Sequence, residues 1–301
     1  MLSRRVQRTL DPSPLYDSFS RALGDAYHPT TNPNGIISLG IAENTLMYKD
    51  LASFLDTNLR ITPDLLGYGA VATGPPSLLT GLLRLYNSAP FDPVVPVAAE
   101  HLAFSSGCTA ILENLFWCLC DEDDGVLIGK PLYGGFANDL GTRARGVLIA
   151  VSLKGYDPFS KEAVTPYEEE LVKAQERGTK VRILVLCTPH NPIGQYIPPL
   201  MFGCNGRCYS REVMVEYMRL CQKYHIHLIS DEIYALTTFP TDDIPNPEKF
   251  VSLLSIPKEG LIDPRLCHVV HGMSKVPSPK QYPQRHIDSR TFVRMVFDSG
   301  C

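Results

Sequence analysis

His225-Ile-His-Leu-Ile-Ser-Asp-Glu-Ile-Tyr234 begins as a short apolar run and ends as a cluster of polar residues. A similar run, Val181–Cys187, comes shortly before Asn191, and a third, Cys267–His271, comes shortly before Lys275. Bounded apolar runs of this length predict buried strands. Helical stretches separate them, so we predict an α/β fold with a mainly parallel sheet and flanking helices. The marked polar residues would then meet at the carboxyl ends of the strands, where such sheets bind ligands.

The rest of the chain extends this pattern. Residues 1–50 alternate proline and polar residues with short apolar patches, and they predict an N-terminal arm or small-domain segment with one strand-like run at 35–42. We assign 51–275 to one large domain and 276–301 to a polar tail without a strand or helix pattern. Within the large domain we expect strands at 102–105, 126–129 and 146–152, and helices at 78–85 (capped by Ser77), 110–120, 167–178 and 211–224.

Bulk properties exclude several classes of protein. The 301 residues are 44% hydrophobic and 20% charged, which is typical of a globular chain with a substantial core. A net charge of −4 argues against a nucleic-acid partner, and no apolar run reaches the ~18 residues that cross a membrane. Nine scattered cysteines argue against a disulfide framework and for a reducing, cytoplasmic location. No Gly-x-Gly-x-x-Gly follows a first strand, which argues against a nucleotide-binding Rossmann protein, and His225-x-His227 on a strand does not suggest a metal site.

Lys275 and Asp231 suggest a specific chemistry. A lysine amine condenses with an aldehyde, and partial burial lowers its pKa enough to make it a nucleophile. A carboxylate after a buried strand pairs with a protonated pyridine nitrogen and keeps that ring electron-accepting. Taken singly, Lys275 also fits a surface lysine, and Asp231 fits an N-cap or turn aspartate. In order along the chain, they predict a site for pyridoxal 5′-phosphate (PLP).

Five more positions fit the same cofactor. Tyr234 and Asn191 are placed to bind the ring's O3′ oxygen, although a turn asparagine before proline is the simpler interpretation of Asn191. Cys108 and Thr109 open a predicted helix, whose backbone N–H groups and dipole suit a phosphate. Tyr133 follows a strand and is placed to stack on the ring, with a core tyrosine as the alternative.

Together these stretches resemble fold-type I PLP enzymes, the class I/II aminotransferase superfamily. Within it, the sequence is similar to 1-aminocyclopropane-1-carboxylate (ACC) synthase and its fungal relatives. The resemblance implies the large domain of an aspartate aminotransferase-like fold. It runs from about residue 15 to residue 275 and is carried by 39–46, 68–69, 106–110, 131–140, 191–194, 230–234 and 274–275.

The resemblance also implies roles. Lys275 would form the Schiff base, and the cofactor would be bound by Tyr68, Cys108, Thr109, Tyr133, Asn191, Asp231, Tyr234 and Ser274. In the family, the tyrosine matching Tyr68 reaches the neighbouring subunit's cofactor, so a homodimer is expected. Glu43 matches an acidic residue near the amino-acid substrate.

Two stretches depart from the family pattern. Residues 196–207 look inserted, because removing them joins Gln195 to Cys208 in a normal family sequence. After Lys275, the expected phosphate arginine and the small domain with its carboxylate-binding arginine have no matching motif. We therefore expect the small domain to be largely missing and the sheet to be incomplete, with an exposed strand edge. Weak PLP binding and little turnover would follow.

Three functional hypotheses remain open. The first is a PLP-dependent enzyme that acts at Cα of an α-amino acid, as an aminotransferase or as an ACC synthase-like enzyme. The second is a catalytically inactive truncated pseudoenzyme or dimer partner. The third is a carbon–sulfur lyase of secondary metabolism. No residue identified in the sequence separates transamination from loss of a β or γ substituent.

Translated introns would explain both departures. Every valine codon begins with GT, the usual start of an intron, and Val276 directly follows the family-like stretch. We predict that the mature transcript lacks the codons for 196–207 and continues differently after codon 275. Sequencing the spliced message tests this, and a mature message that encodes both segments would refute it.

Overall fold

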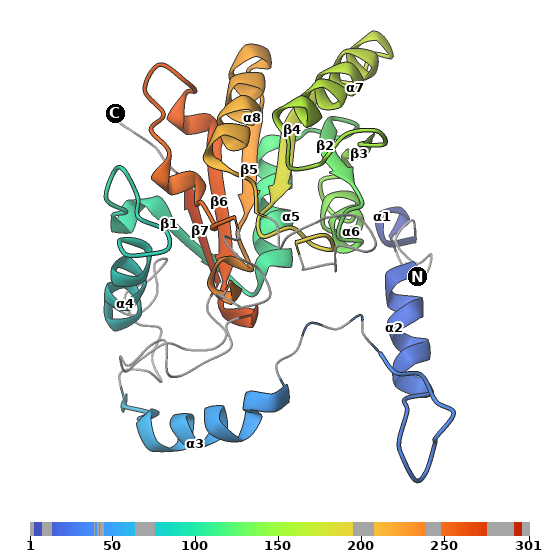
Figure 1. Ribbon diagram of the computed structural model, residues 1–301, viewed down its shortest axis with the longest axis vertical. Helices are drawn as coiled ribbons and strands as arrows, with labels where there is room; N and C mark the ends of the chain where they lie inside the picture. The colour runs from blue at the N-terminus through green and yellow to red at the C-terminus, as the bar shows by residue number, and fades with distance from the viewer. Residues whose placement is uncertain are drawn as a thin grey trace.

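A seven-stranded sheet forms the centre of the computed structural model, with strand order β1-β7-β6-β5-β4-β2-β3 (Figure 1). The structure describes residues 3–7, 14–38, 40, 42, 45–63, 76–194, 208–238, 248–275 and, for the backbone, 292–296. Strands β2 to β6 are parallel, and β7 is antiparallel to both of its neighbours, β1 and β6. The strands are β1 (Leu102–Ser105), β2 (Gly125–Lys130), β3 (Val147–Ser152), β4 (Val181–Cys187), β5 (His227–Asp231), β6 (Cys267–Gly272) and β7 (Phe292–Val296).

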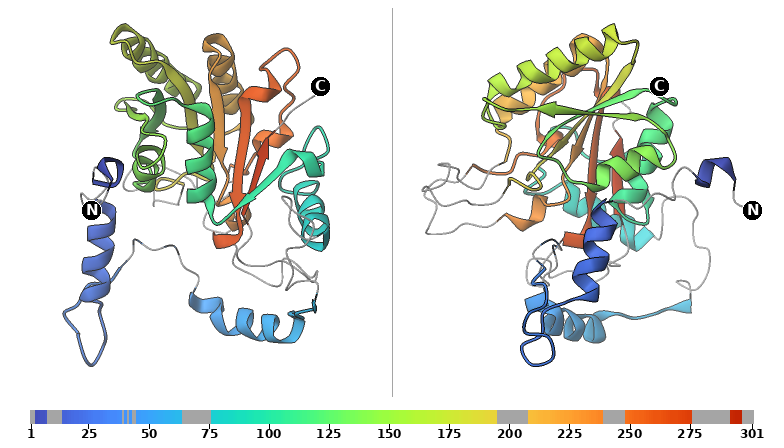
Figure 2. Two further views of the ribbon diagram at one scale, coloured as in Figure 1. Left: turned by 180° about the vertical axis from the view of Figure 1, so that it is seen from behind. Right: turned by 90° about the vertical axis from the view of Figure 1, so that its right-hand side faces the viewer.

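Helices cover both faces of this sheet. Helices α5 and α6 lie on one face, and α7 and α8 lie on the other (Figure 2). The helices are α1 (Arg4–Gln7), α2 (Pro14–Gly24), α3 (Tyr48–Asn58), α4 (Pro76–Tyr86), α5 (Cys108–Leu119), α6 (Gly135–Gly141), α7 (Val164–Glu176) and α8 (Arg211–Tyr224). Short 3₁₀ helices are η1 (Thr45–Met47), η4 (Ala99–His101), η5 (Lys161–Ala163), η6 (Ala235–Thr237), η7 (Leu253–Ser255), η8 (Pro264–Leu266) and η9 (Met273–Lys275).

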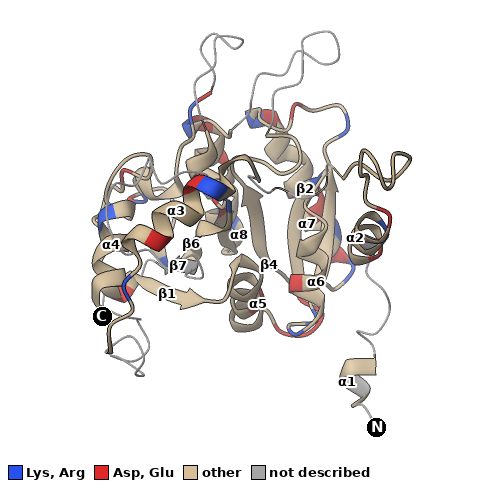
Figure 3. Cartoon of the chain, turned by 90° about the horizontal axis from the view of Figure 1, so that it is seen from below, with Lys and Arg blue, Asp and Glu red and all other residues tan. Residues whose placement is uncertain are grey.

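The N-terminal helices differ from the others in their burial. Helix α3 has no buried residue, and α2 and α3 lie outside the layers that enclose the sheet (Figures 1 and 2). In the view of Figure 3, acidic and basic residues of the described part of the chain are intermixed along the cartoon. Because α2 and α3 lie outside these layers, the core is built by the segments from α4 onward.

The two-sided burial explains the sequence of β4. Ile183, Val185 and Cys187 pack with the α5 and α6 side, whereas Leu184 and Leu186 pack with the α7 and α8 side. Side chains alternate between the two faces of a strand, so a strand covered on both faces needs a continuous apolar run. The sequence Val-Arg-Ile-Leu-Val-Leu-Cys meets that requirement almost completely.

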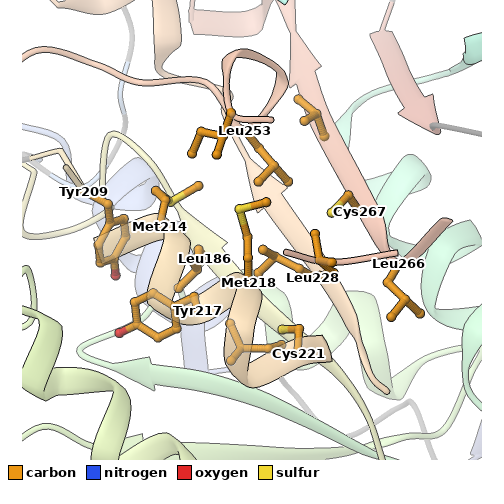
Figure 4. Packing of buried hydrophobic residues seen from close by; sticks show 14 of the residues in the cluster. Leu186, Tyr209, Met214, Tyr217, Met218, Cys221, Leu228, Leu253, Leu266 and Cys267 are labelled. Atoms are coloured by element: carbon orange, nitrogen blue, oxygen red, sulfur yellow. The ribbon is translucent and has the colours of Figure 1, made fainter. Parts of the chain in front are cut away.

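Helix α8 shows how its caps and its apolar face fix its position. The Ser210 hydroxyl accepts a hydrogen bond from the Val213 backbone N–H (3.4 Å) and so caps the helix N-terminus. His225 ends the helix in the left-handed region (φ 52°), which turns the chain directly into β5. Tyr217 and Met218 pack onto the strands beneath them (Figure 4).

The predicted fold class is confirmed, and the predicted strands of the large domain agree with the structure to within a few residues. Three details differ. The described residues of the run at 35–42 form no strand, and Ile36 makes only an isolated bridge to Ala26. Ser77 lies within α4, which begins at Pro76, so it is not the cap. We expected an incomplete sheet with an exposed strand edge, but β7 pairs with both β1 and β6. This strand lies in the tail, where the sequence pattern predicted no strand. Residues 196–207 lie outside the described residues.

Truncating the central strand should test the core. Leu184 is fully buried, so we predict that Leu184→Ala lowers the free energy of unfolding by about 2–5 kcal/mol. The matched change Leu23→Ala, at a residue 70% exposed, should cost less than about 0.5 kcal/mol. Urea unfolding of both variants measures the difference, and equal losses would contradict this core assignment.

Candidate active site

The backbone of Asp231 is fixed in the middle of the sheet. Asp231 is the last residue of β5 and pairs with Cys187 on β4 and with Val270 on β6. Its carbonyl oxygen accepts a hydrogen bond from the Thr188 N–H (2.8 Å), and the next N–H, of Glu232, donates to the Val270 carbonyl (2.7 Å). These bonds on both sides hold the Asp231 side chain at the carboxyl ends of three parallel strands.

The Asp231 carboxyl is buried without a compensating cation. Its exposed fraction is 5%, and it accepts a hydrogen bond from the Ile233 N–H (3.2 Å). No ion pair joins it to any other described residue. Burial raises its pKa to about 7, because the charged form loses its hydration. A cationic hydrogen-bond donor would stabilise the carboxylate here, and a protonated pyridine nitrogen fits that requirement.

Glu232 is the neighbouring carboxyl, and the protein satisfies it internally. Its oxygens accept hydrogen bonds from the Ser230 hydroxyl (2.9 Å), the Ser252 hydroxyl (2.7 Å) and the Leu253 N–H (2.8 Å). Burial raises its pKa to about 7 as well, whereas these donors favour the charged form. Glu232 therefore ties the end of β5 to the segment around Leu253, which leaves Asp231 as the carboxyl available to a ligand.

Lys275 ends η9, directly after the neighbouring strand β6. Its Nζ donates a hydrogen bond to the Ala42 carbonyl (3.0 Å), and Ser274 beside it is exposed. The Lys275 charge also acts on Cys108, where it favours the thiolate. Burial and the Asp231 charge outweigh this effect, so the pKa of the Cys108 thiol is raised and the thiol stays neutral. Lysine, aspartate and the start of α5 thus share one neighbourhood.

Helix α5 begins at the residues predicted to bind phosphate. Gly107 adopts φ 101°, a conformation that favours glycine, and the helix starts at Cys108. The first-turn N–H groups of a helix lack intrahelical acceptors and attract anions. The Thr109 side chain is exposed, and its hydroxyl favours the charged form of the nearby Asp139 carboxyl on α6, which lowers the pKa of that carboxyl.

Two phenols lie near Asp231. Tyr133 is 36% exposed and meets Phe136 edge-on, with ring centroids 5.5 Å apart. Burial raises the pKa of Tyr234 to about 12, and the Cys187, Asp231 and Tyr133 charges act in the same direction. Both phenols therefore keep their protons near neutral pH and are available as hydrogen-bond donors.

Asn191 follows β4 on the other side of Asp231. The thiol of Cys187, the residue paired with Asp231, donates a hydrogen bond to the carbonyl of Pro189 (3.4 Å), two residues before Asn191. Burial raises the pKa of Cys187, with Asp231 as the next contribution, so this thiol is protonated. The turn after β4 is thereby held beside the same carboxyl.

The structure brings most of the predicted site residues to one end of the sheet. Cys108, Tyr133, Asp231, Tyr234 and Lys275 interact electrostatically with at least one other member of the group. Their roles stay predictions.

Several predicted and unpredicted positions remain to be placed. Tyr68 and Glu43 lie outside the described residues. Two neighbours were not predicted: the carbonyl of Ala42 and the carboxyl of Asp139. An acidic residue between Phe136 and Leu140, on the apolar face of a short helix, was the signal for Asp139.

The described part of the chain contains neither a candidate metal site nor a membrane-spanning helix. None of its groups of His, Cys, Asp or Glu has the arrangement of a metal site. None of its helices combines the length and the apolar character of a membrane span.

Comparisons with known proteins agree with this geometry. The profile of the Aminotransferase class I and II family matches residues 35–276. Aminotransferase verI of Clonostachys rogersoniana is 33% identical over 84% of this chain and 56% of its own length. An ACC synthase of Oryza sativa, number 6, is 28% identical over 88% of this chain and 48% of its own length. The chain thus spans about half the length of these curated relatives.

Solved structures share the fold. An archaeal alanine:glyoxylate aminotransferase superposes with a TM-score of 0.67 at 18% identity, covering 99% of this chain and 64% of that one. The aspartate aminotransferase of Thermus thermophilus with maleate gives a TM-score of 0.61 at 20% identity, covering 98% of this chain and 64% of that one.

The burial of Asp231 should make stability depend on pH. A carboxyl whose pKa is about 7 when folded and about 3.9 when unfolded stabilises least when ionised, so stability is lost as pH rises from about 4 to 7. We predict that Asp231→Asn flattens this decline and raises the free energy of unfolding at pH 8 by about 2–4 kcal/mol in the cofactor-free protein. Urea unfolding between pH 4.5 and 8 measures it.

The matched control is Glu176→Gln, at an exposed carboxyl near the end of α7. It should leave the pH profile of unfolding unchanged. A profile of Asp231→Asn that coincides with that of the natural protein would contradict the uncompensated burial.

Proposed function

We propose, on the premise that this chain belongs to the aminotransferase class I and II family, that it forms the cofactor-binding part of a PLP-dependent enzyme acting at Cα of an α-amino acid. The observation that carries the proposal is the buried, uncompensated carboxyl of Asp231 beside the strand that leads to Lys275. Amino-group transfer is the favoured reaction, because relatives such as verI are named aminotransferases.

Asp231 is proposed to bind the pyridine nitrogen. When bound, PLP supplies an electron sink for the carbanion that forms at Cα. A charge-assisted hydrogen bond from a ring N–H⁺ would compensate the Asp231 carboxylate and hold the ring in its electron-accepting state. Glu232 supports this role indirectly, since its three hydrogen bonds fix the turn that follows β5.

Lys275 is proposed to anchor the aldehyde and then to move the Cα proton. Both steps need a neutral amine, so the lysine must give up the proton that it donates to the Ala42 carbonyl. Its position after β6, next to the end of β5, supports the placement of an amine and a carboxylate around one ring.

The remaining residues are proposed to orient the cofactor. The N–H groups at Cys108 and Thr109 would hold the phosphate at the start of α5, where the helix dipole favours an anion. Tyr133 would stack on the ring, while the Tyr234 phenol and Asn191 would donate to O3′. Ser274 is proposed as a further cofactor contact.

The substrate side of the site extends beyond the described residues. Glu43 is proposed to face an amino-acid substrate, and Tyr68 to reach the cofactor of a second subunit in a homodimer. ACC synthases among the relatives keep a second outcome open, in which a substituent is lost instead of the amino group being transferred. Incubation with amino acid plus 2-oxo acid, with S-adenosylmethionine and with a cysteine conjugate separates transfer from synthase and lyase reactions.

Chemical labelling tests the proposed lysine directly. Borohydride reduction in the presence of PLP should attach a pyridoxyl group at Lys275, because only an amine that has condensed with the aldehyde is trapped. Peptide mapping by mass spectrometry locates the label, and we predict that Lys275→Ala reduces labelling to background.

Lys130 provides the matched control, since it is exposed at the end of β2, on the same edge of the sheet. Lys130→Ala should retain the label at position 275. A label at another lysine, or no label in the natural chain, would overturn the proposal in favour of an inactive protein.

A further inference from the structure

Asp139 is a buried carboxyl at the edge of the candidate site that the proposed chemistry does not use. It lies near the end of α6 with an exposed fraction of 5%. Its Oδ2 has no hydrogen-bond partner among the described residues. An orphaned buried oxygen is costly, so its surroundings call for an explanation.

The contact of Asp139 with Thr109 provides one. Thr109 is the second residue of α5, and its hydroxyl, which has a single proton, lies near enough to the Asp139 carboxyl to act on the pKa of that carboxyl. If Asp139 is ionised, Thr109 must donate that proton to it and presents only lone pairs elsewhere. If Asp139 is neutral, the acid can donate to Thr109 Oγ1, and the Thr109 proton becomes available to a second acceptor.

We propose that Asp139 is a positioning residue for the phosphate of the cofactor. As a neutral acid it donates to Thr109 Oγ1, and Thr109 in turn donates to a phosphate oxygen at the N-terminus of α5. This inference rests on the proposed function and deepens it, because it makes anion binding depend on a proton outside the phosphate site itself.

The surrounding charges favour the neutral acid. The pKa of Asp139 is raised to about 7, chiefly by burial. The charge of Asp231 on β5 is the next contribution, and the charge of Glu113 on α5 is a smaller one. The Thr109 hydroxyl opposes them. Cys108 on α5 and Tyr133 before α6 also face Asp139, and both have raised pKa values, so they add no charge near neutral pH. A phosphate dianion nearby would favour protonation again.

The affinity for phosphate should therefore fall as pH rises. The quantity to measure is the ratio of the Kd of pyridoxal to the Kd of PLP, from absorbance titrations between pH 6.5 and 8.5. Titration of Lys275 and Asp231 affects both aldehydes, so the ratio isolates the phosphate. The second pKa of a phosphate monoester is about 6, so the ligand itself changes little in this range. In the natural chain we expect the ratio to fall about tenfold.

Three variants distinguish positioning from a merely structural role. Asp139→Asn keeps a permanent donor to Thr109, so its ratio should stay high and vary less than about twofold across the range. Asp139→Leu removes the donor, so its ratio should be low at every pH. Glu113→Gln, the matched charge control on α5, should keep the decline of the natural chain. Thermal unfolding of each variant checks that it is folded.

The outcomes separate this inference from the proposed function. If both aldehydes bind and label Lys275, but the ratio is independent of pH or Asp139→Asn declines like the natural chain, the role of Asp139 is refuted and the proposed function stands. If neither aldehyde binds, both fall together. A flat, high ratio in Asp139→Asn beside a falling ratio in the natural chain supports the hydrogen-bond chain from Asp139 through Thr109.

Discussion

The uncompensated carboxyl of Asp231 is the constraint on which the site depends. Hydrogen bonds to the turn after β4 and to β6 hold its backbone, so the side chain cannot move to solvent without breaking the sheet. Burying that charge is costly because both faces of the sheet are covered. Within β4, Ile183 packs into the apolar core on one face and Leu184 into the core on the other. A cationic ligand would relieve the cost, which links ligand binding to the stability of the fold.

Adjacent acidic residues have opposite fates at this point in the chain. The Glu232 carboxylate accepts hydrogen bonds from three protein donors and so stabilises the fold. The Asp231 carboxylate accepts one from the Ile233 N–H and has no cation beside it among the described residues. With Asp139, three buried carboxyls have pKa values raised to about 7, each chiefly by burial. The Asp231 charge also raises the pKa of Asp139, so a cation bound at Asp231 and a proton bound at Asp139 are two ways to reduce the charge of the same cluster.

Local sequence patterns predicted what depends on local chemistry. Strand β4 and helix α8 were predictable because a nearly continuous apolar run favours a buried strand and an amphipathic stretch favours a helix. Strand β7 was missed, since Phe292–Val296 is short and its position depends on the gap between β1 and β6, which lie far away in sequence. Asp139 was missed although it lies between the apolar residues Phe136 and Leu140, because its burial also depends on the packing of α6 against α5, a separate segment of the chain.

The hydrogen bond between Lys275 and Ala42 connects the candidate site to the N-terminal arm. The arm contributes the backbone carbonyl of Ala42, which accepts a hydrogen bond from the Lys275 ammonium. The lysine has to lose a proton before it can act as a nucleophile. This hydrogen bond holds the Lys275 side chain next to the arm. Condensation with an aldehyde would break this hydrogen bond and leave the Ala42 carbonyl without that donor. Any group that takes the place of Lys275 at this carbonyl has to be a hydrogen-bond donor.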